Sequence, residues 1–245
     1  MPGNQLFRVD KLLALTGVGR SEAKKLIASG RVTVSGTVVR DPGLKTSPDL
    51  LFLDGQPISV ETDLYLMLNK PAGVITATED KRFPTVLSLL PDKYQRRRLG
   101  PVGRLDRDVT GLVLLTTDGE LAHRLISPKW KAEQTYRAVC EGRLTPADAD
   151  AFRAGLQLSD FTARPAELQI VSATDEQSVA DATLTEGKFH QVKRMFIAVG
   201  HPLISLKRTR IGCVNLDEAL QEGEFRPLTD AEIRGLKAQT SLLKE

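Results

Sequence analysis

The sequence of 245 residues has few of the residue types that bind metals or form disulfides. It contains two cysteines, Cys140 and Cys213, and three histidines, and none of them belongs to a CxxC or HExxH motif. Two cysteines so far apart in the chain need not pair, which favours a reduced, cytoplasmic protein. The glycines at 100 and 103 start no GxGxxG or GKS/T loop. We therefore expect neither a metal site nor a bound cofactor.

Long hydrophobic runs are missing as well. No apolar run exceeds five residues, the length of the run at 64–68, whereas a membrane-spanning helix needs about 20. The first residues, MPGNQLFRVDKLL, contain no apolar core of a secretory signal. Hydrophobic residues make up 41% of the chain and charged residues 27%, which is typical of globular proteins. The sequence therefore predicts a protein that neither crosses a membrane nor is exported.

The net charge of +3 is small, but the positive charge is concentrated in three segments. Residues 1–45 carry eight Lys or Arg against three Asp or Glu. The ratio is twelve to six over residues 81–137 and six to one over residues 186–210. Each cluster by itself is compatible with an ordinary solvated surface. Three such clusters in one chain favour binding to a polyanion such as a nucleic acid.

Residues 1–62 form a first candidate domain. We expect two short helices followed by a hairpin of two strands, with Ser21 as the N-cap of the second helix. The expected ranges are 8–16 and 22–29 for the helices, and 32–34 and 37–39 for the strands. A segment rich in Pro, Gly and Asp closes the domain.

Residues 63–245 form a second, larger candidate domain. Its predicted strands cover residues 64–68, 74–78, 112–116, 136–140, 167–171 and 179–184. Its predicted helices cover residues 118–126 and 190–199 and the segments that follow Thr145 and Thr229, where capping signals stand. Because strands do not alternate regularly with helices, the sequence predicts an α+β fold with a mixed, mainly antiparallel sheet.

Six basic residues crowd the first domain: Arg8, Lys11, Arg20, Lys24, Lys25 and Arg31. Two helices with one basic face suit the phosphates of a nucleic acid, although a solvated helical hairpin has the same composition. The ordered pattern R-V-D-K, S-E-A-K-K and I-A-S-G-R-V-T-V-S-G resembles the S4 RNA-binding domain, with Val9 and Ser35 in place of the usual Leu and Asn. The resemblance covers about 40 residues. It implies RNA binding through this basic surface and, by itself, no reaction.

The second motif is Gly-Arg-Leu-Asp at 103–106, which continues as RDVTGLVLLTTDGELAHRL. Read alone, it is a polar loop before an apolar strand, and its aspartate is explained equally well as a turn residue. The whole segment closely resembles the GRLD motif of the RsuA-like group of pseudouridine synthases. In that family the aspartate is the catalytic nucleophile. The resemblance therefore implies this role for Asp106, and it implies that Arg104 helps to hold the flipped-out nucleotide.

Two further motifs of the same family follow in the same order. The sequence QTY at 134–136 resembles a K-T-Y motif whose tyrosine stacks on the target uracil, although Tyr136 also fits a core aromatic at the start of a strand. The sequence HQVK at 190–193 resembles an H-Q-x-R/K motif, and implies that Lys193 lies beside the aspartate. Such a cation favours the ionised carboxylate. Leu206 is implied as an apolar wall for the base.

Together the motifs imply an enzyme that isomerises uridine to pseudouridine in RNA without a cofactor. The FHQVKRM sequence at 189–195 resembles the small-subunit enzymes of this group rather than the N-R-E/Q-V/I-R-R-M of large-subunit enzymes. This resemblance favours a uridine of small-subunit (16S) ribosomal RNA, in a partly assembled particle. A large-subunit synthase of the same group and a non-catalytic S4-type RNA-binding protein remain as alternatives. The latter would have a damaged GRLD motif or no tyrosine, and both are intact here. We expect a monomer that acts in the cytoplasm.

Overall fold

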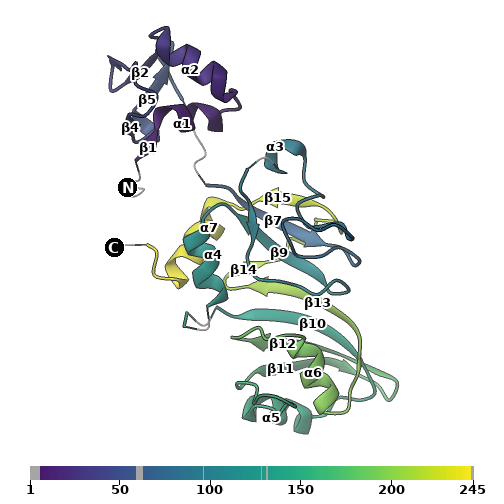
Figure 1. The fold of residues 1–245 in the computed structure, drawn as a ribbon. Coiled ribbons are helices and arrows are strands. Elements are labelled where there is room, and N and C mark those ends of the chain that lie inside the picture. The colour runs from purple at the N-terminus through teal and green to yellow at the C-terminus, as the bar shows by residue number, and fades with distance from the viewer. Residues whose placement is uncertain (1–5, 59–62, 96, 128, 131, 244–245) are drawn as a thin grey trace. The chain divides into compact units, whose positions relative to one another are not determined.

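The structure is a computed structural model that describes residues 6–58, 63–95, 97–127, 129–130 and 132–243 (Figure 1). The chain divides into two compact units, and the division falls between Asp63 and Leu64. Among the described residues, the N-terminal unit holds one hydrophobic cluster and the C-terminal unit holds two. Strands and helices do not alternate regularly and the large sheet is mainly antiparallel, so the predicted α+β class is confirmed.

The N-terminal unit packs two short helices against a four-stranded antiparallel sheet of order β3-β2-β5-β6. Its elements are β1 (Phe7–Arg8), α1 (Val9–Leu15), α2 (Arg20–Ala28), β2 (Val32–Val34), β3 (Thr37–Val38), β4 (Lys45–Thr46), β5 (Leu51–Leu53) and β6 (Gln56–Pro57). Ser35 and Gly36 both have positive φ, as the predicted tight hairpin requires. The apolar residues of both helices point into the core: Leu12, Leu13 and Ile27 are fully buried.

The expected N-cap of the second helix was wrong. The helix begins at Arg20, and Gly19 is its N-cap. The backbone oxygen of Gly19 accepts the first intrahelical hydrogen bond, from Ala23 N at 2.8 Å. Ser21 therefore lies inside the first turn, where its hydroxyl is past the position from which a side chain caps the helix.

In the C-terminal unit, the described residues form a nine-stranded sheet with the main order β11-β12-β10-β13-β9-β7-β15. Its strands are β7 (Tyr65–Lys70), β8 (Gly100–Pro101), β9 (Thr110–Thr116), β10 (Gln134–Glu141), β11 (Glu167–Ala173), β12 (Gln177–Leu184), β13 (Leu203–Ile211), β14 (Val214–Asn215) and β15 (Phe225–Pro227). The helices are α3 (Asp92–Gln95), α4 (Gly119–Ile126), α5 (Pro146–Ala154), α6 (Gln191–Ala198) and α7 (Asp230–Gln239). The predicted capping box at Thr229 is formed, and α5 starts with Pro146 as predicted, where Thr145 also forms a capping box.

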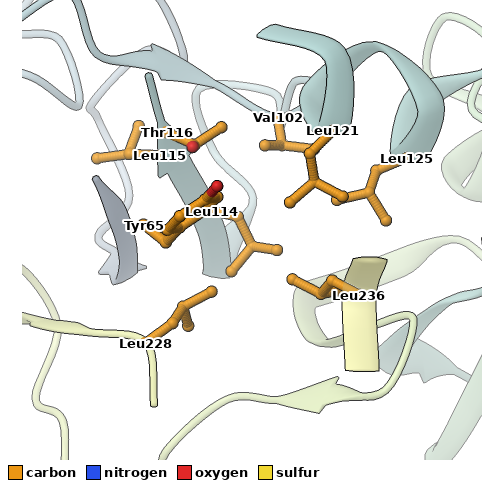
Figure 2. Close-up of a pocket in the computed structure, with 9 residues that line it drawn as sticks. All are labelled: Tyr65, Val102, Leu114, Leu115, Thr116, Leu121, Leu125, Leu228 and Leu236. Carbon is orange, nitrogen blue, oxygen red and sulfur yellow. The ribbon is translucent and has the colours of Figure 1, made fainter. Parts of the chain in front are cut away.

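The two faces of this sheet bury different clusters. Successive residues of β7 alternate between them, so Leu66 and Leu68 belong to one cluster and Met67 to the other. Helices α4 and α7 cover the face of Met67, beside β14, and α5 and α6 cover the other face near β10–β12 (Figure 1). On the α4–α7 side, apolar side chains surround a small cavity of about 10 Å³, among them Leu114, Leu121 and Leu236 (Figure 2). This space belongs to the apolar core and offers no polar group to a ligand.

One predicted strand was wrong, and one central strand was missed. Residues 74–78 form a loop whose only strand-like contact is a bridge between Ile75 and Thr85. Conversely, β13 was not predicted, although it lies in the middle of the sheet between β10 and β9. Its sequence, LISLKRTRI, carries three basic residues in nine, and so lacks the apolar run expected of a central strand.

Pairing between β9 and β13 is parallel, and every other pair in this sheet is antiparallel among the described residues. At this pair, Gly111 faces Arg208 with a positive φ of 98°. A Cβ at this position would lie 2.3 Å from the Arg208 carbonyl oxygen. Only glycine fits such an approach. The close contact fixes the start of β9, directly after the loop that carries Asp106.

Candidate active site

Asp106 lies on the loop between β8 and β9, and hydrogen bonds with the segment that follows β7 hold this loop in place. The buried hydroxyl of Thr76 donates to the Leu105 carbonyl at 3.0 Å and accepts from the Leu105 amide at 3.1 Å. The amide of Gly73 donates to the Arg107 carbonyl at 2.8 Å. The residues on either side of Asp106 are therefore fixed, while its own side chain remains 30% exposed.

Lys70 is the strongest anchor of this loop, and the sequence reasoning missed it. Its side chain is fully buried at the end of β7 and donates to the carbonyl oxygens of Pro71, Arg107 and Val109 at 2.9, 3.2 and 2.7 Å. Burial lowers the pKa of Lys70 to about 8, against the opposing charges of Asp108 and Asp106. The sequence did hold a signal for this role: Lys70 is the last residue of an apolar strand. A lysine that is buried there needs hydrogen-bond partners.

The carboxylate of Asp106 is bracketed by two basic side chains from the start of α6. Lys193 Nζ lies 3.2 Å from one carboxylate oxygen, and His190 Nε2 lies 3.5 Å from the other. The structure thus brings Asp106 and Lys193 together, as the sequence resemblance implied. His190 joins them, although the sequence analysis gave it no role at the aspartate.

Lys193 also pairs with a second carboxylate, which the sequence analysis did not single out. Its Nζ donates to both oxygens of Asp108, at 2.7 and 2.8 Å. The hydrogen bond from Lys193 lowers the pKa of Asp108. Partial burial lowers the pKa of Lys193, but its hydrogen bonds to Asp108 and Asp106 outweigh this effect, so the pKa of Lys193 is raised. Lys193 is therefore a fixed cation shared by two carboxylates.

The turn before α6 is rigid. Glu186 is buried and accepts from Gln191 Nε2 at 2.7 Å and from the Arg164 amide at 2.8 Å. Gln191 Oε1 in turn accepts from the Lys188 amide at 2.9 Å. His190 adopts the left-handed conformation, with φ 52°. This conformation is costly for a residue with a Cβ, and the surrounding hydrogen bonds hold it in place.

Tyr136 and Leu206 lie on the same sheet face as the Asp106 loop. Both are buried, and they share one hydrophobic cluster with Leu105 and Val109. Tyr136 pairs with Arg208, which pairs in turn with Gly111 at the start of β9. The Tyr136 hydroxyl donates to Gln134 Oε1 at 2.9 Å. The strands that carry Tyr136 and Leu206 and the strand that follows Asp106 therefore lie side by side.

Arg208 was also missed. It is 1% exposed. Its Nε donates to the Leu112 carbonyl and its Nη1 donates to Gln134 Oε1, both at 2.8 Å. Its guanidinium lies 6.0 Å from the Tyr136 ring centroid. Gln134, which departs from the usual Lys of its motif, therefore accepts from both Tyr136 and Arg208.

Arg104 is exposed, and the described part of the structure shows no ion pair for it. The six basic residues of the N-terminal unit are also exposed but differ in their contacts. Arg8 and Arg31 pair with Asp10 and Asp54, and Lys11 lies over the Phe7 ring. For the other three, no ion pair is seen within the described ranges: Arg20, Lys24 and Lys25.

The described residues hold neither a candidate metal centre nor a membrane helix. No group of three or more His, Cys, Asp or Glu side chains among them could hold a metal ion. No described helix is long and apolar enough to span a membrane.

Comparison with known protein families identifies the family of this chain. The family model described as RNA pseudouridylate synthase matches residues 64–198, more than half of the chain. The chain belongs to this family. The synthase also matches the S4 domain model, over residues 7–49. The predicted resemblance is thereby confirmed, and with it the activity: this protein is an isomerase that converts uridine to pseudouridine in RNA.

Individual relatives match this synthase along nearly their whole length. It is 42% identical to ribosomal small subunit pseudouridine synthase A of Escherichia coli strain K12, over 93% of this chain and 98% of the relative. It is 40% identical to an uncharacterized RNA pseudouridine synthase of Bacillus subtilis, YtzG, over 93% and 97%. A crystal structure of a pseudouridylate synthase matches with a TM-score of 0.66 at 37% identity, covering 94% of this chain and 99% of the other.

Proposed function

We propose that this synthase modifies one uridine of small-subunit ribosomal RNA, with Asp106 as the covalent nucleophile. The observation that carries the proposal is the Asp106 carboxylate, which is accessible, held on a fixed loop and bracketed by Lys193 and His190. Lys193 places a positive charge at one oxygen of this carboxylate, and the ionised form of a carboxylate is the nucleophilic one.

The reaction rearranges bonds without gain or loss of atoms. The N1–C1′ bond of uridine breaks, the uracil turns, and C5 bonds to C1′. The proton on C5 leaves and N1 ends with a proton, so the product is an isomer of the substrate. Asp106 forms the transient bond to the nucleotide, and Lys193 stabilises the carboxylate before and after this bond exists. Tyr136 stacks on the uracil, against the wall provided by Leu206, and is a candidate for a proton transfer.

The target base has to leave its stack before it reaches Asp106. Extrusion costs a few kcal/mol, and less in a loop than in a duplex. Arg104, exposed and two residues before Asp106, is placed to hold the phosphate of the extruded nucleotide. Residues 1–62, as an S4 domain, supply RNA affinity through their basic surface, and residues 63–245 supply catalysis.

Support for the small subunit comes from the similar enzyme of Escherichia coli, whose name states that substrate. The HQVK sequence gives a second argument. It differs from the motif of large-subunit enzymes, and its His190 and Lys193 both lie beside Asp106. We propose that the uridine lies in an RNA loop that is accessible only in a partly assembled particle. The synthase acts there as a monomer in the cytoplasm.

Asp106→Asn tests the role of the nucleophile. Asparagine preserves the shape but forms no covalent bond, so we expect normal folding and RNA binding without detectable turnover. The assay maps pseudouridine in purified small-subunit RNA, large-subunit RNA and assembly intermediates after incubation with each protein. Turnover by Asp106→Asn within about tenfold of the parent would exclude this role. Modification of large-subunit RNA alone would overturn the proposed substrate.

A further inference from the structure

The aromatic residue next to the active-site histidine has no assigned function. Phe189 is 77% exposed, the highest exposure among the large hydrophobic residues in the described part of the chain. Its ring is stacked on the ring of His190, with centroids 3.8 Å apart and an angle of 19° between the planes. His190 covers one face of the phenyl ring, so the exposed area includes the opposite face.

The position of this ring relates it to the nucleophile. Phe189 stacks on His190, and His190 Nε2 lies 3.5 Å from Asp106 Oδ1. One imidazole ring, that of His190, therefore contacts both the exposed Phe189 ring and the Asp106 carboxylate.

The support of the ring is rigid and positively charged. Lys188 Nζ lies 3.7 Å from the Phe161 ring centroid, and Arg194 lies over the same ring at 5.0 Å. Together with the hydrogen bonds of Gln191, these contacts fix the chain on both sides of Phe189. A preorganised aromatic surface loses little conformational entropy on binding. The exposed Lys188, next to Phe189 in the chain, favours an RNA strand over an apolar protein surface as the partner of this ring.

We propose that the open face of Phe189 stacks on the base of a nucleotide directly adjacent to the target uridine. Rotation of a uridine out of its stack leaves the neighbouring base with one uncovered face. An aromatic side chain replaces the missing stacking partner, and does so for any base because every base has a π-face. Phe189 thus lowers the cost of extruding the uridine. The inference rests on the proposed function, since it takes Asp106 as the destination of the uridine.

Kinetics of three variants test this role. Phe189→Ala and Phe189→Leu should lower kcat/KM on small-subunit RNA by roughly tenfold to a hundredfold, whereas Phe189→Trp should retain it, because stacking on a base contributes affinity in this range. Ile197→Ala is the matched control, since Ile197 is 62% exposed on α6, the helix that follows Phe189. Equal kcat/KM for the parent and Phe189→Ala would overturn the proposal.

A binding measurement separates stacking on RNA from mere support of the His190 ring. A synthetic fragment of the RNA carries 2-aminopurine in turn at each nucleotide flanking the mapped uridine. The parent and His190→Ala should quench its fluorescence by stacking at one flanking position, and Phe189→Leu should not. Quenching that is equal in all three proteins, or absent only in His190→Ala, would show that Phe189 does not contact the base.

Failure of this inference is distinguishable from failure of the proposed function. If the parent protein forms no pseudouridine in the small-subunit RNA, the proposed substrate is wrong. If the parent is active and Phe189→Ala is equally active, only the stacking role is wrong. Phe189→Ala could instead bind RNA normally but no longer bind a protein that the parent captures. This result would show that the ring contacts that protein and not the RNA.

Discussion

At the scale of single residues, one cation is shared between two carboxylates at the proposed active site. Lys193 makes shorter contacts to Asp108 than to Asp106, so its charge is held in place even when Asp106 is engaged elsewhere. Asp108 is 74% exposed, and exposed ion pairs contribute little free energy of folding. We therefore infer that Asp108 positions Lys193, while Lys193 acts on Asp106.

Lys193→Met should lower kcat more than about a hundredfold, because Asp106 and Asp108 both lose the lysine that pairs with them. Asp108→Asn is the matched variant and should stay within about fivefold of the parent, since its exposed pair is worth at most ~1 kcal/mol. The double variant, which combines Lys193→Met with Asp108→Asn, should be more active than Lys193→Met alone, because it carries one unpaired carboxylate fewer. Single-turnover rates on the RNA measure all three. Parental rates for Lys193→Met would remove the cation from the mechanism.

Lys70 gives a prediction about pH and stability. Its pKa is about 8 in the native protein, below the value near 10.4 of an unfolded chain. Between these values the unfolded state binds more protons, so this group makes the native state more stable as the pH rises. The free energy of unfolding of the parent relative to Lys70→Met should thus increase above about pH 8, by up to ~1.4 kcal/mol per pH unit.

Urea unfolding of both proteins across this pH range measures the difference. Lys81→Met, which removes an exposed lysine, should show no such trend relative to the parent. A constant difference between the parent and Lys70→Met would mean that the buried amine keeps its ordinary titration.

At the scale of elements, the parallel pair β9–β13 determines where Asp106, the proposed nucleophile, lies. β13 carries Leu206 and Arg208, and pairs on its other side with β10, which carries Tyr136. The only parallel pairing among the described strands of this sheet thus brings the start of β9 beside two other motifs. Gly111 makes this pairing possible, because its backbone approaches β13 too closely for a side chain.

Gly111→Ala should destabilise the C-terminal unit by about 3 kcal/mol or more, since the added Cβ meets backbone and the residue has a positive φ. The corresponding decrease in Tm is roughly 6–12 °C for a protein of this size. Gly119→Ala is the control, because an alanine Cβ there would meet nothing within 4 Å and the residue starts helix α4. Calorimetry measures the Tm of both variants. An unchanged Tm for Gly111→Ala would contradict the close approach of its backbone to β13.

At the scale of the whole molecule, the two units have separate hydrophobic clusters and separate proposed tasks. The exposed cations of α2, for which the described residues offer no ion pair, are the best candidates for phosphate contacts. Arg8 and Arg31, by contrast, already have carboxylate partners. Electrostatic contacts with phosphates make RNA affinity strongly dependent on salt.

Replacing Arg20, Lys24 and Lys25 together by Gln should weaken RNA binding without changing the rate at saturating enzyme. The slope of log affinity against log salt should decrease by about 0.7–0.9 for each phosphate that the triple variant no longer binds. Arg143→Gln, in the other unit, removes an exposed cation paired with Asp175 and should leave the slope unchanged. An equal slope for the triple variant and the parent would assign α2 to another partner.

The sequence by itself determined the family, the α+β class, most helices and the order of the motifs, because these features reside in local patterns of residues. It did not reveal Lys70, Thr76 or Arg208, whose partners are backbone atoms that lie far away in the chain. It also did not predict β13, since burial of a basic strand depends on its neighbours. The bracketing of Asp106 by His190 and Lys193 arises only when the start of α6 packs beside the β8–β9 loop. Distances between side chains that are some 85 residues apart are set by tertiary packing, which no local pattern encodes.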